Sequence, residues 1–242
     1  MIIAEQIRAK IDTFPSGHVF TLSDFALDST KEVALAKLLS RMAASGKLRK
    51  VSKGKYYKPK ETTFGIIKPA YEELVKDFLE KNGEMIGYVT GTAAFGQMGL
   101  TTQISSKLTI GTNHYRRPVK RGDYKVYFLK QDNPITAENV ALLLILDAIK
   151  LIRTIPGTSP NEACKAIIGL ISALSDEQVS ELEKLSLKYT NYVRAVTGAI
   201  LEYIGKPSSL VRKSLNGTSA YKLPISSDVL PTKSNWRIYE PA

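Results

Sequence analysis

Residues 47–59, KLRKVSKGKYYKP, give the clearest indication of how the first part of this 242-residue chain folds. Six of its thirteen residues are Lys or Arg, and the pair Lys53-Gly54 separates two short segments of β character. Such a pair between two extended segments predicts a β-hairpin. The like charges repel one another, so they must be solvated or neutralised by an acidic partner.

Three helical patterns precede this hairpin. Isoleucines recurring at every fourth position predict a first helix near the start of the chain, and residues 22–26, LSDFA, predict a brief second one. A third helix begins near Ser29 and stops before Gly46. Its apolar stripe consists of Leu35, Leu38, Leu39 and Met42. A helix, a short helix, a longer helix and a β-hairpin follow one another in this order in a winged helix-turn-helix domain.

The third helix has a polar face opposite its apolar stripe. A recognition helix needs this division, because one face packs on its own domain while the other enters the major groove. Arg41 can read guanine through two hydrogen bonds, and Lys37 can do the same or hold a phosphate. The candidate DNA-binding residues of this helix are Thr30, Lys31, Lys37, Ser40 and Arg41. A solvated helix face is the alternative, and the basic hairpin that follows favours nucleic-acid binding.

The hairpin itself predicts the wing. Its expected phosphate contacts are Arg49, Lys50, Lys53 and Lys55. Each neutralised phosphate releases counterions, so the affinity should fall steeply with salt. Tyr56 and Tyr57 point to opposite faces of their strand, and for each of them a core position is the favoured interpretation.

Positive charge is grouped along the chain. The net charge is +11, from 34 basic and 23 acidic residues. Residues 1–60 carry +7, residues 107–130 carry +6 and residues 206–242 carry +4, whereas residues 61–106 and residues 131–205 each carry −3. Blocks of one sign favour localised contact with a polyanion.

The remaining sequence predicts a second, larger domain. Residues 1–62 are expected to form the winged-helix domain, and residues 63–242 an α+β domain with a helical C-terminal half, so the fold class is α+β. The segments SKLTIGT and DYKVYFL predict strands. Residues 136–204 are helical in three segments broken at IPGTSP and LSDEQ, and the tail predicts short strands near Tyr221 and Trp236.

The connection between the two predicted strands, NHYRRPVKRG, is strongly basic. Its candidate DNA-binding residues are Arg116, Arg117, Lys120 and Arg121. A flexible solvated loop and a second contact with a polyanion both remain open, with a slight preference for the contact because arginine is the better bidentate phosphate partner.

Residues that could carry catalysis are sparse. The chain has two histidines, His18 and His114, and one cysteine, Cys164, which lies in an apolar helical run and is expected to be buried and inert. The sequence contains no metal-spaced set of Cys and His, no phosphate-binding loop and no serine elbow. We therefore expect no enzymatic activity, no catalytic residue, no metal and no cofactor.

The sequence also predicts a cellular location. The opening MIIAEQIRAKID has no signal-peptide core, and the apolar run NVALLLILDAI is too short to span a bilayer. Together with the single cysteine, these features predict a cytoplasmic protein without membrane contact.

Two other function classes remain open. The first is an RNA-binding or translation-linked protein that uses the same basic surfaces. The second is a metal-dependent nuclease, because Asp123 and Lys125 form a D-x-K pattern on a predicted strand. A nuclease core also needs a second acidic ligand from the preceding strand, and SKLTIGT has none.

The segment GYVTGTAAFGQMGLTTQISSKLTIGTN resembles the AbiEi-type antitoxins of bacterial type IV toxin–antitoxin systems, and more closely the Bacteroidetes-type proteins of unknown function grouped with them. The opening IRAKIDTFPSGHVFTLSDF, the wing GKLRKVSKGKYYKPK and a late YKLPIS followed by a Trp support the resemblance, which spans nearly the whole chain.

This resemblance implies a transcriptional regulator whose N-terminal winged helix binds double-stranded operator DNA and represses its own operon. It also implies a C-terminal domain that counters a toxin resembling nucleotidyltransferases, without stable direct binding. Composition and spacing independently favour only the DNA-binding half of this expectation.

Overall fold

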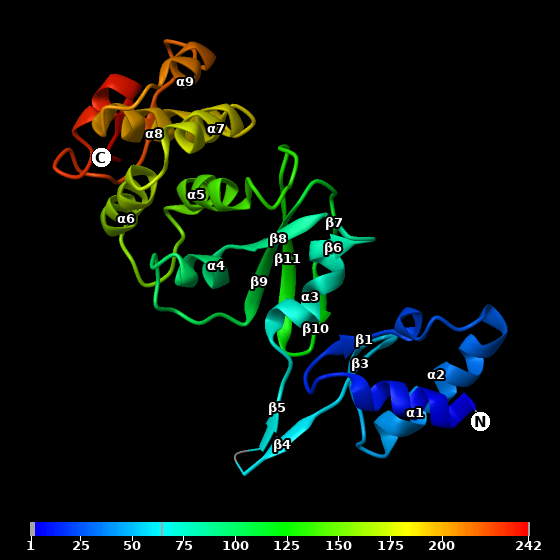
Figure 1. Ribbon diagram of the computed structural model, residues 1–242. Helices are drawn as coiled ribbons and strands as arrows, with labels where there is room; N and C mark the ends of the chain where they lie inside the picture. Colours follow the sequence, from blue (N-terminus) through cyan, green and yellow to red (C-terminus); the bar gives the residue numbers. More distant parts are fainter. Residues whose placement is uncertain (1–2, 64, 242) are drawn as a thin grey trace. The chain divides into compact units, whose positions relative to one another are not determined.

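The computed structural model describes residues 3–63 and 65–241 and divides into two compact units (Figure 1). Unit 1 runs to Asp77 and also includes Val119–Lys125, whereas unit 2 comprises Phe78–Pro118 and continues from Val126. Helices and strands are mixed along the chain, so the predicted α+β class is confirmed. Unit 1 extends beyond residues 1–62, and the domain boundary placed there stays a prediction.

Unit 1 begins with the elements of a winged helix. They are α1 (Ile3–Thr13), β1 (Val19–Phe20), the 3-10 helix η1 (Leu22–Phe25), α2 (Ser29–Ala44), β2 (Arg49–Ser52) and β3 (Lys55–Tyr57). The three strands form one sheet in the order β1-β3-β2, and both pairings are antiparallel. The predicted order of helices and hairpin is confirmed.

Two glycines make the turns of this domain possible. Gly46 follows α2 with φ of 80°, and Gly54 closes the β2–β3 hairpin with φ of 74°. Residues with a side chain rarely adopt these angles, which is why a glycine stands at both places. The pairing register shifts between Lys50 and Ser52, so a β-bulge twists the wing strand.

A small apolar core holds α2 in place. The predicted inward residues Leu35 and Leu39 are fully buried, and Leu38 and Met42 pack at the edge of the same cluster. Tyr56 and Tyr57 are both buried. The buried members of the cluster are Ile7, Ile11, Phe20, Leu35, Leu39, Leu48 and Tyr56.

The rest of unit 1 lies outside the winged helix. Residues 60–67, expected to be a connector, contain the antiparallel strands β4 (Lys60–Thr62) and β5 (Gly65–Ile67). Helix α3 (Tyr71–Leu79) follows, with a buried side formed by Leu74 and Val75. The chain returns to unit 1 with β10 (Val119–Arg121), which lies within the loop expected between two strands.

Unit 2 contains a sheet in which β8 (Gly87–Thr90), β9 (Lys107–Thr112) and β11 (Tyr124–Lys130) are ordered β11-β9-β8. Strands β9 and β11 match the predictions from SKLTIGT and DYKVYFL. The short helix α4 (Thr92–Gln97) connects β8 to the segment before β9, and β6 (Glu80–Lys81) pairs with β7 (Glu84–Met85).

The second half of unit 2 is helical, with one more helix than expected between residues 136 and 204. The break between α7 and α8 contains no Pro or Gly. The residue that precedes α8, Thr190, has extended backbone. Trp236 lies in η2, and the strand expected near it is β13. The elements are α5 (Val140–Leu151), α6 (Pro160–Ser172), α7 (Asp176–Ser186), α8 (Asn191–Tyr203), α9 (Ser209–Ser214), β12 (Tyr221–Lys222), η2 (Pro231–Trp236) and β13 (Ile238–Tyr239).

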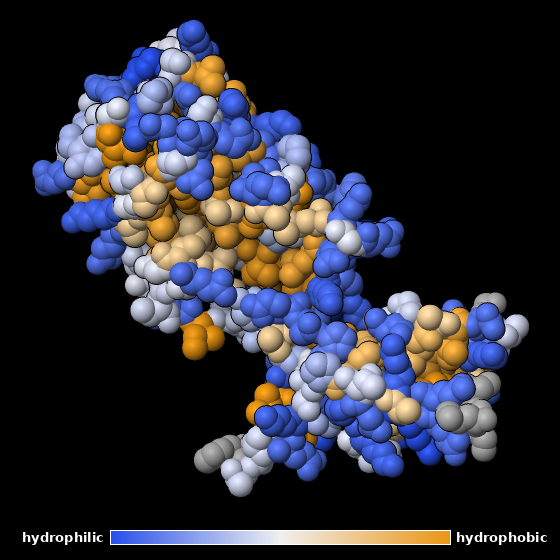
Figure 2. All heavy atoms as spheres, in the orientation of Figure 1, coloured by the Kyte–Doolittle hydropathy of each residue, from blue (hydrophilic) through white to orange (hydrophobic). Residues whose placement is uncertain are grey.

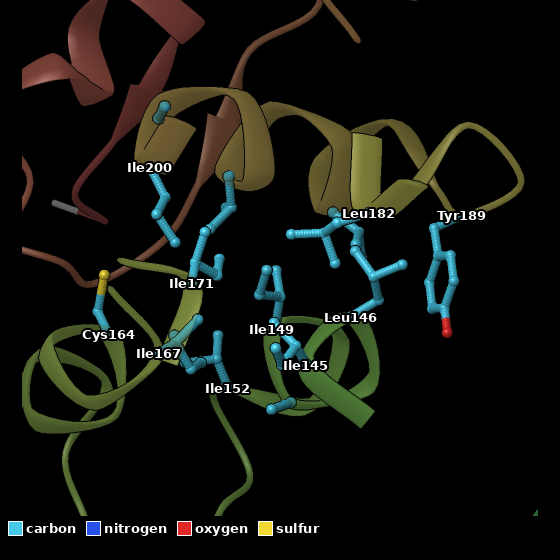
Figure 3. Packing of buried hydrophobic residues seen from close by; sticks show 14 of the residues in the cluster. Ile145, Leu146, Ile149, Ile152, Cys164, Ile167, Ile171, Leu182, Tyr189 and Ile200 are labelled. Carbon is cyan, nitrogen blue, oxygen red and sulfur yellow. The ribbon is translucent and has the colours of Figure 1, made fainter. Parts of the chain in front are cut away.

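The helices of unit 2 share a large apolar core. Figure 3 shows side chains of α5 and α6 facing those of α7 and α8. Cys164 is buried in this core, and burial raises the pKa of its thiol to about 12, as expected for an inert residue. Figure 2 shows hydrophilic side chains over much of the visible surface of unit 1 and hydrophobic residues gathered over part of unit 2.

A buried polar network joins the sheet of unit 2 to its helices. The carboxyl group of Asp147 on α5 is fully buried and accepts hydrogen bonds from the hydroxyl groups of Tyr88 (2.8 Å), Thr90 (2.9 Å) and Tyr189 (2.9 Å). Gln131 donates through Nε2 to both tyrosine oxygens. Burial raises the pKa of Asp147, and it also raises the pKa of both tyrosines.

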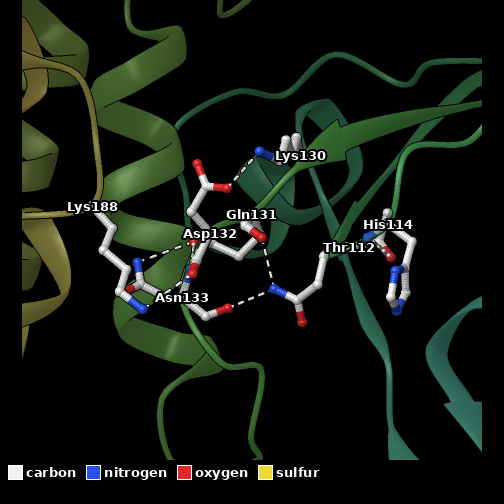
Figure 4. A network of polar contacts seen from close by, with 8 residues as sticks. Thr112, His114, Lys130, Gln131, Asp132, Asn133 and Lys188 are labelled. Atoms are coloured by element: carbon white, nitrogen blue, oxygen red, sulfur yellow. Dashed lines mark hydrogen bonds and ion pairs between the residues drawn. The ribbon is translucent and has the colours of Figure 1, made fainter.

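The chain after β11 is anchored at its backbone (Figure 4). Asn113 donates through Nδ2 to the carbonyl groups of Gln131 (2.6 Å) and Asn133 (2.7 Å). Lys188, beyond α7, donates to the carbonyl group of Asp132 at 3.2 Å. These bonds fix how β9 and β11 lead into the helical half of unit 2.

Asp147 should make the stability of unit 2 depend on pH. Its folded-state pKa lies above the value in the unfolded chain, so stability is lost as the pH rises between the two values. Asp147→Asn cannot ionise. The free energy of unfolding of the variant minus that of the parent should therefore rise as the pH increases above about 4, by about 1.4 kcal/mol per unit of difference between the folded-state and unfolded-state pKa. Urea denaturation followed by the fluorescence of the single tryptophan, Trp236, measures both proteins. A difference that falls as the pH rises would mean that the three hydrogen bonds, which lower the pKa of Asp147, outweigh the burial that raises it.

Two helical glycines of unit 2 form a matched pair of test positions. A Cβ on Gly198 would lie 2.2 Å from atoms of the Trp236 ring, whereas one on Gly169 would meet no atom within 4 Å. Gly198→Ala should lower the free energy of unfolding by about 1–3 kcal/mol, and Gly169→Ala should raise it by about 0.5–1 kcal/mol. Thermal unfolding followed by circular dichroism measures both. Equal effects of the two substitutions would rule out close packing of Trp236 on α8.

Candidate nucleic-acid interface

The outward face of α2 presents polar and basic side chains to solvent. Burial of Leu35 and Leu39 turns the opposite side of the helix outward. Thr30, Lys37, Ser40 and Arg41 are exposed, and Lys31 is half-buried, with its ammonium group 3.6 Å from the carboxylate of Asp28. Four of the five residues predicted on this helix are therefore open to a ligand.

The wing adds a second group of cations in the same unit. Arg49 and Lys50 on β2 and Lys53 at the turn are exposed. Of the basic residues predicted as contacts on α2 and the wing, those that form no ion pair within residues 3–63 and 65–241 are Lys37, Arg41, Arg49, Lys50 and Lys53. Their charges are therefore available to an anionic partner.

Two of the predicted contacts are instead held by Asp77. The ammonium group of Lys55 lies 2.5 Å from one carboxylate oxygen of Asp77, and the guanidinium of Arg121 lies 3.2 Å from the other. Only 14% of the Lys55 side chain and 15% of the Arg121 side chain are exposed. This triad ties the wing strand β3 to α3 and β10 within unit 1, so both cations have a structural role in this conformation.

The second basic block is divided between the two units. Lys120 is exposed on β10 in unit 1, whereas Arg116 and Arg117 belong to unit 2. The guanidinium of Arg116 lies 5.4 Å from the ring centroid of Phe78, a cation–π contact, and Arg117 is exposed. The block is therefore not one continuous loop of solvated charge.

Two residues of this region were not predicted from the sequence. Val33 is 64% exposed on α2, four residues before Lys37, so it shares the outward face. The spacing of Val33 from Lys37 indicates that both lie on the same helix face. Val33 was not predicted there because its side chain is apolar. Asp77 carried no such signal, because its partners lie far from it in the sequence.

The residues weighed for catalysis have other partners. Asp123 forms an ion pair with Lys68; the hydrogen bond and charge of each partner raise the pKa of Lys68 and lower that of Asp123. His18 lies 3.1 Å from the carboxylate of Glu73, which also accepts a hydrogen bond from the backbone of Val19. Among the described residues, no group of three or more His, Cys, Asp or Glu side chains is placed to hold a metal ion.

The arrangement on unit 1 suits recognition of a polyanion. An exposed helix face carries groups that can donate hydrogen bonds to base edges, and the wing carries cations that can hold phosphates. In the part of the chain that is described, no helix is both long enough and apolar enough to cross a bilayer.

Comparison with known proteins adds a family and a fold. No curated protein matches the chain. A crystal structure of the RV2827C protein from Mycobacterium tuberculosis is similar, with a TM-score of 0.52, 15% sequence identity, and coverage of 89% of this chain and 82% of that one. At this identity the similarity supports the fold alone. Residues 6–179 match the family of unknown function DUF6088, and the chain therefore belongs to the DUF6088 family.

Proposed function

We propose that this protein is a sequence-specific DNA-binding transcriptional regulator that reads double-stranded DNA with α2 and holds the phosphate backbone with its wing. The observation that carries the proposal is that five of the cations predicted as contacts on α2 and the wing form no ion pair within residues 3–63 and 65–241, and all five belong to unit 1. A group of uncompensated like charges on one unit attracts a polyanion and raises its local concentration.

The composition of the outward face of α2 supports reading of bases. Arg41 has the fork of donors that fits the two acceptors of guanine, and Ser40 can bond to more than one base. The exposed Val33 offers a methyl surface that suits the methyl group of thymine. A face used only for phosphate binding would have no need of an exposed valine.

The triad around Asp77 narrows the expected wing contacts. Because Lys55 is paired with Asp77 in a half-buried position, the phosphate contacts of the wing are assigned to Arg49, Lys50 and Lys53. The triad holds β3 where it leaves the hairpin turn, so the free cations are presented on a fixed support rather than on a mobile loop.

The resemblance to AbiEi-type antitoxins extends the proposal to an operon. We propose that the operator lies upstream of the protein's own gene and that the neighbouring gene encodes a toxin resembling nucleotidyltransferases. Expression of the neighbouring gene alone should stop growth, and co-expression of this protein should restore it. A neighbouring product that leaves growth unchanged would contradict the antitoxin role and leave the DNA-binding role to be judged on its own test.

Arg41→Ala should relax the preference for one base position. We expect a loss of about 1–3 kcal/mol of binding free energy on the preferred duplex and a smaller loss on random DNA. Arg8→Ala is the matched control, because Arg8 is an exposed arginine on α1; it should leave the base preference unchanged. Fluorescence anisotropy with both duplexes and with an RNA duplex of the same sequence measures the effect. Tighter binding of the RNA would favour the RNA-binding alternative, and an Arg41 variant with the parent's preference would refute the recognition role of α2.

Lys53 and Lys55 should differ in their effect on the salt dependence of DNA binding. Lys53 is exposed and unpaired in the structure, so Lys53→Ala should reduce the slope of log K against log salt by about 0.9. Lys55→Ala removes a side chain already paired with Asp77, so its slope should stay near that of the parent. Titrations with sodium chloride on one duplex give both slopes. Equal reductions would mean that Lys55 leaves Asp77 to bind phosphate.

A further inference from the structure

A pocket in unit 2, distant in sequence from the proposed DNA-binding elements, has the composition of an anion site. It has a volume of about 460 Å³, within the range of small-molecule sites. The end of α5 and the residues after it line one side, Tyr192 of α8 contributes a ring, and the segment at β12 completes it. Its lining consists of Lys150, Leu151, Arg153, Thr154, Tyr192, Ala220, Tyr221 and Lys222.

Three of these lining residues are cations, and no lining residue is acidic. In the described part of the chain, Lys150, Arg153 and Lys222 form no ion pair. Lys150 interacts electrostatically with the carboxyl groups of Asp132 and Asp147, neither of which lines the pocket. A cleft lined by one sign of charge concentrates ions of the opposite sign.

The three cations reach the pocket from two segments that are far apart in the sequence. Lys150 lies in the last turn of α5 and Arg153 lies two residues beyond its end, where the carboxyl end of the helix dipole favours cations. That dipole does not explain Lys222, which comes from β12. The parallel pairing of β12 with β13 fixes the backbone there, with Lys222 opposite Tyr239. The convergence of these charges is therefore set by the tertiary fold.

The aromatic residues of the pocket supply a second kind of contact. The hydroxyl group of Tyr192 donates to the carbonyl group of Ile149, which fixes the ring, and the guanidinium of Arg153 lies 5.8 Å from the ring centroid. The hydroxyl oxygen of Tyr221 is buried, and among the described residues it has no hydrogen-bond partner. A buried hydroxyl group normally has a partner, and Tyr221 lines both this pocket and a second one beside Arg212 and Trp236, so a polar ligand atom in either pocket could supply it.

We propose that this pocket binds a nucleoside monophosphate. The phosphate contacts the guanidinium group of Arg153 and the ammonium group of Lys222, whereas the ammonium group of Lys150 lies 5.7 Å from the ring centroid of Tyr189, outside the lining. The base packs against the tyrosine rings, as bases stack on aromatic side chains elsewhere. The hydroxyl group of Tyr221 bonds to a polar atom of the nucleoside. This site lies in unit 2 and does not depend on DNA binding by unit 1.

Isothermal titration calorimetry of the full chain tests the ligand class. The probes are AMP, GMP, CMP and UMP, with inorganic phosphate and adenosine as the separate halves of the ligand. At least one nucleotide should bind saturably with a Kd below about 1 mM, and each half should bind about tenfold more weakly or worse. Failure of all four nucleotides to saturate, or equal affinity for inorganic phosphate, would overturn the assignment.

Charge-matched variants test the location. Arg153→Gln with Lys222→Gln should weaken nucleotide binding about tenfold or more. The control combines Lys165→Gln with Lys213→Gln, which removes the same charge from exposed positions outside the pocket and should keep the parent's affinity. An equal loss in both double variants would assign the effect to net charge and reject the pocket.

Tyr221→Phe tests the unpartnered hydroxyl group separately. The variant should keep the parent's melting temperature without nucleotide and bind about three- to tenfold more weakly, the range expected for one hydrogen bond. Unchanged affinity would mean that Tyr221 does not contact the ligand. The preference for a nucleoside monophosphate over a simple anion would then be unsupported.

Discussion

The burial of Leu35 and Leu39 against Phe20 and Leu48 is the interaction on which the proposed DNA-binding surface depends. A helix can bury only one face in a core this small, so the burial of these leucines turns the polar face of α2 to solvent. Leu48 stands just before β2 and belongs to the same apolar cluster. One cluster therefore fixes both the helix and the start of the wing, and their cations belong to one compact unit.

Much of unit 1 could be predicted because its signals are local. The leucine spacing of α2, Gly46 after it and Gly54 in the hairpin each act within a few residues of one another, and the structure has the expected element at each place. The Asp77 triad could not be predicted this way. Lys55 and Arg121 are 22 and 44 residues from their shared partner, and only the tertiary fold shows that the two cations are already paired.

Unit 2 was less predictable for a similar reason. Asp147 stands in a run of leucines and isoleucines where a charge would be very costly, and its three hydroxyl donors come from distant segments. The break before α8 contains no Gly or Pro, and Thr190 at its end has extended backbone but makes no side-chain capping hydrogen bond. The pocket cations Arg153 and Lys222 likewise meet only in the folded chain. Unit 2 thus combines a buried polar network with the pocket that we propose as a second site, and no sequence motif predicts either.

The central claim is that unit 1 recognises a DNA sequence. The most direct measurement is selection of bound duplexes from a random-sequence pool by the full-length protein, repeated over several rounds at physiological salt. We expect enrichment of one short motif, no longer than the stretch of duplex that a single recognition helix and its wing can cover. A pool that stays random while binding remains strong would contradict it, because the cations of α2 and the wing would then hold phosphates without reading bases.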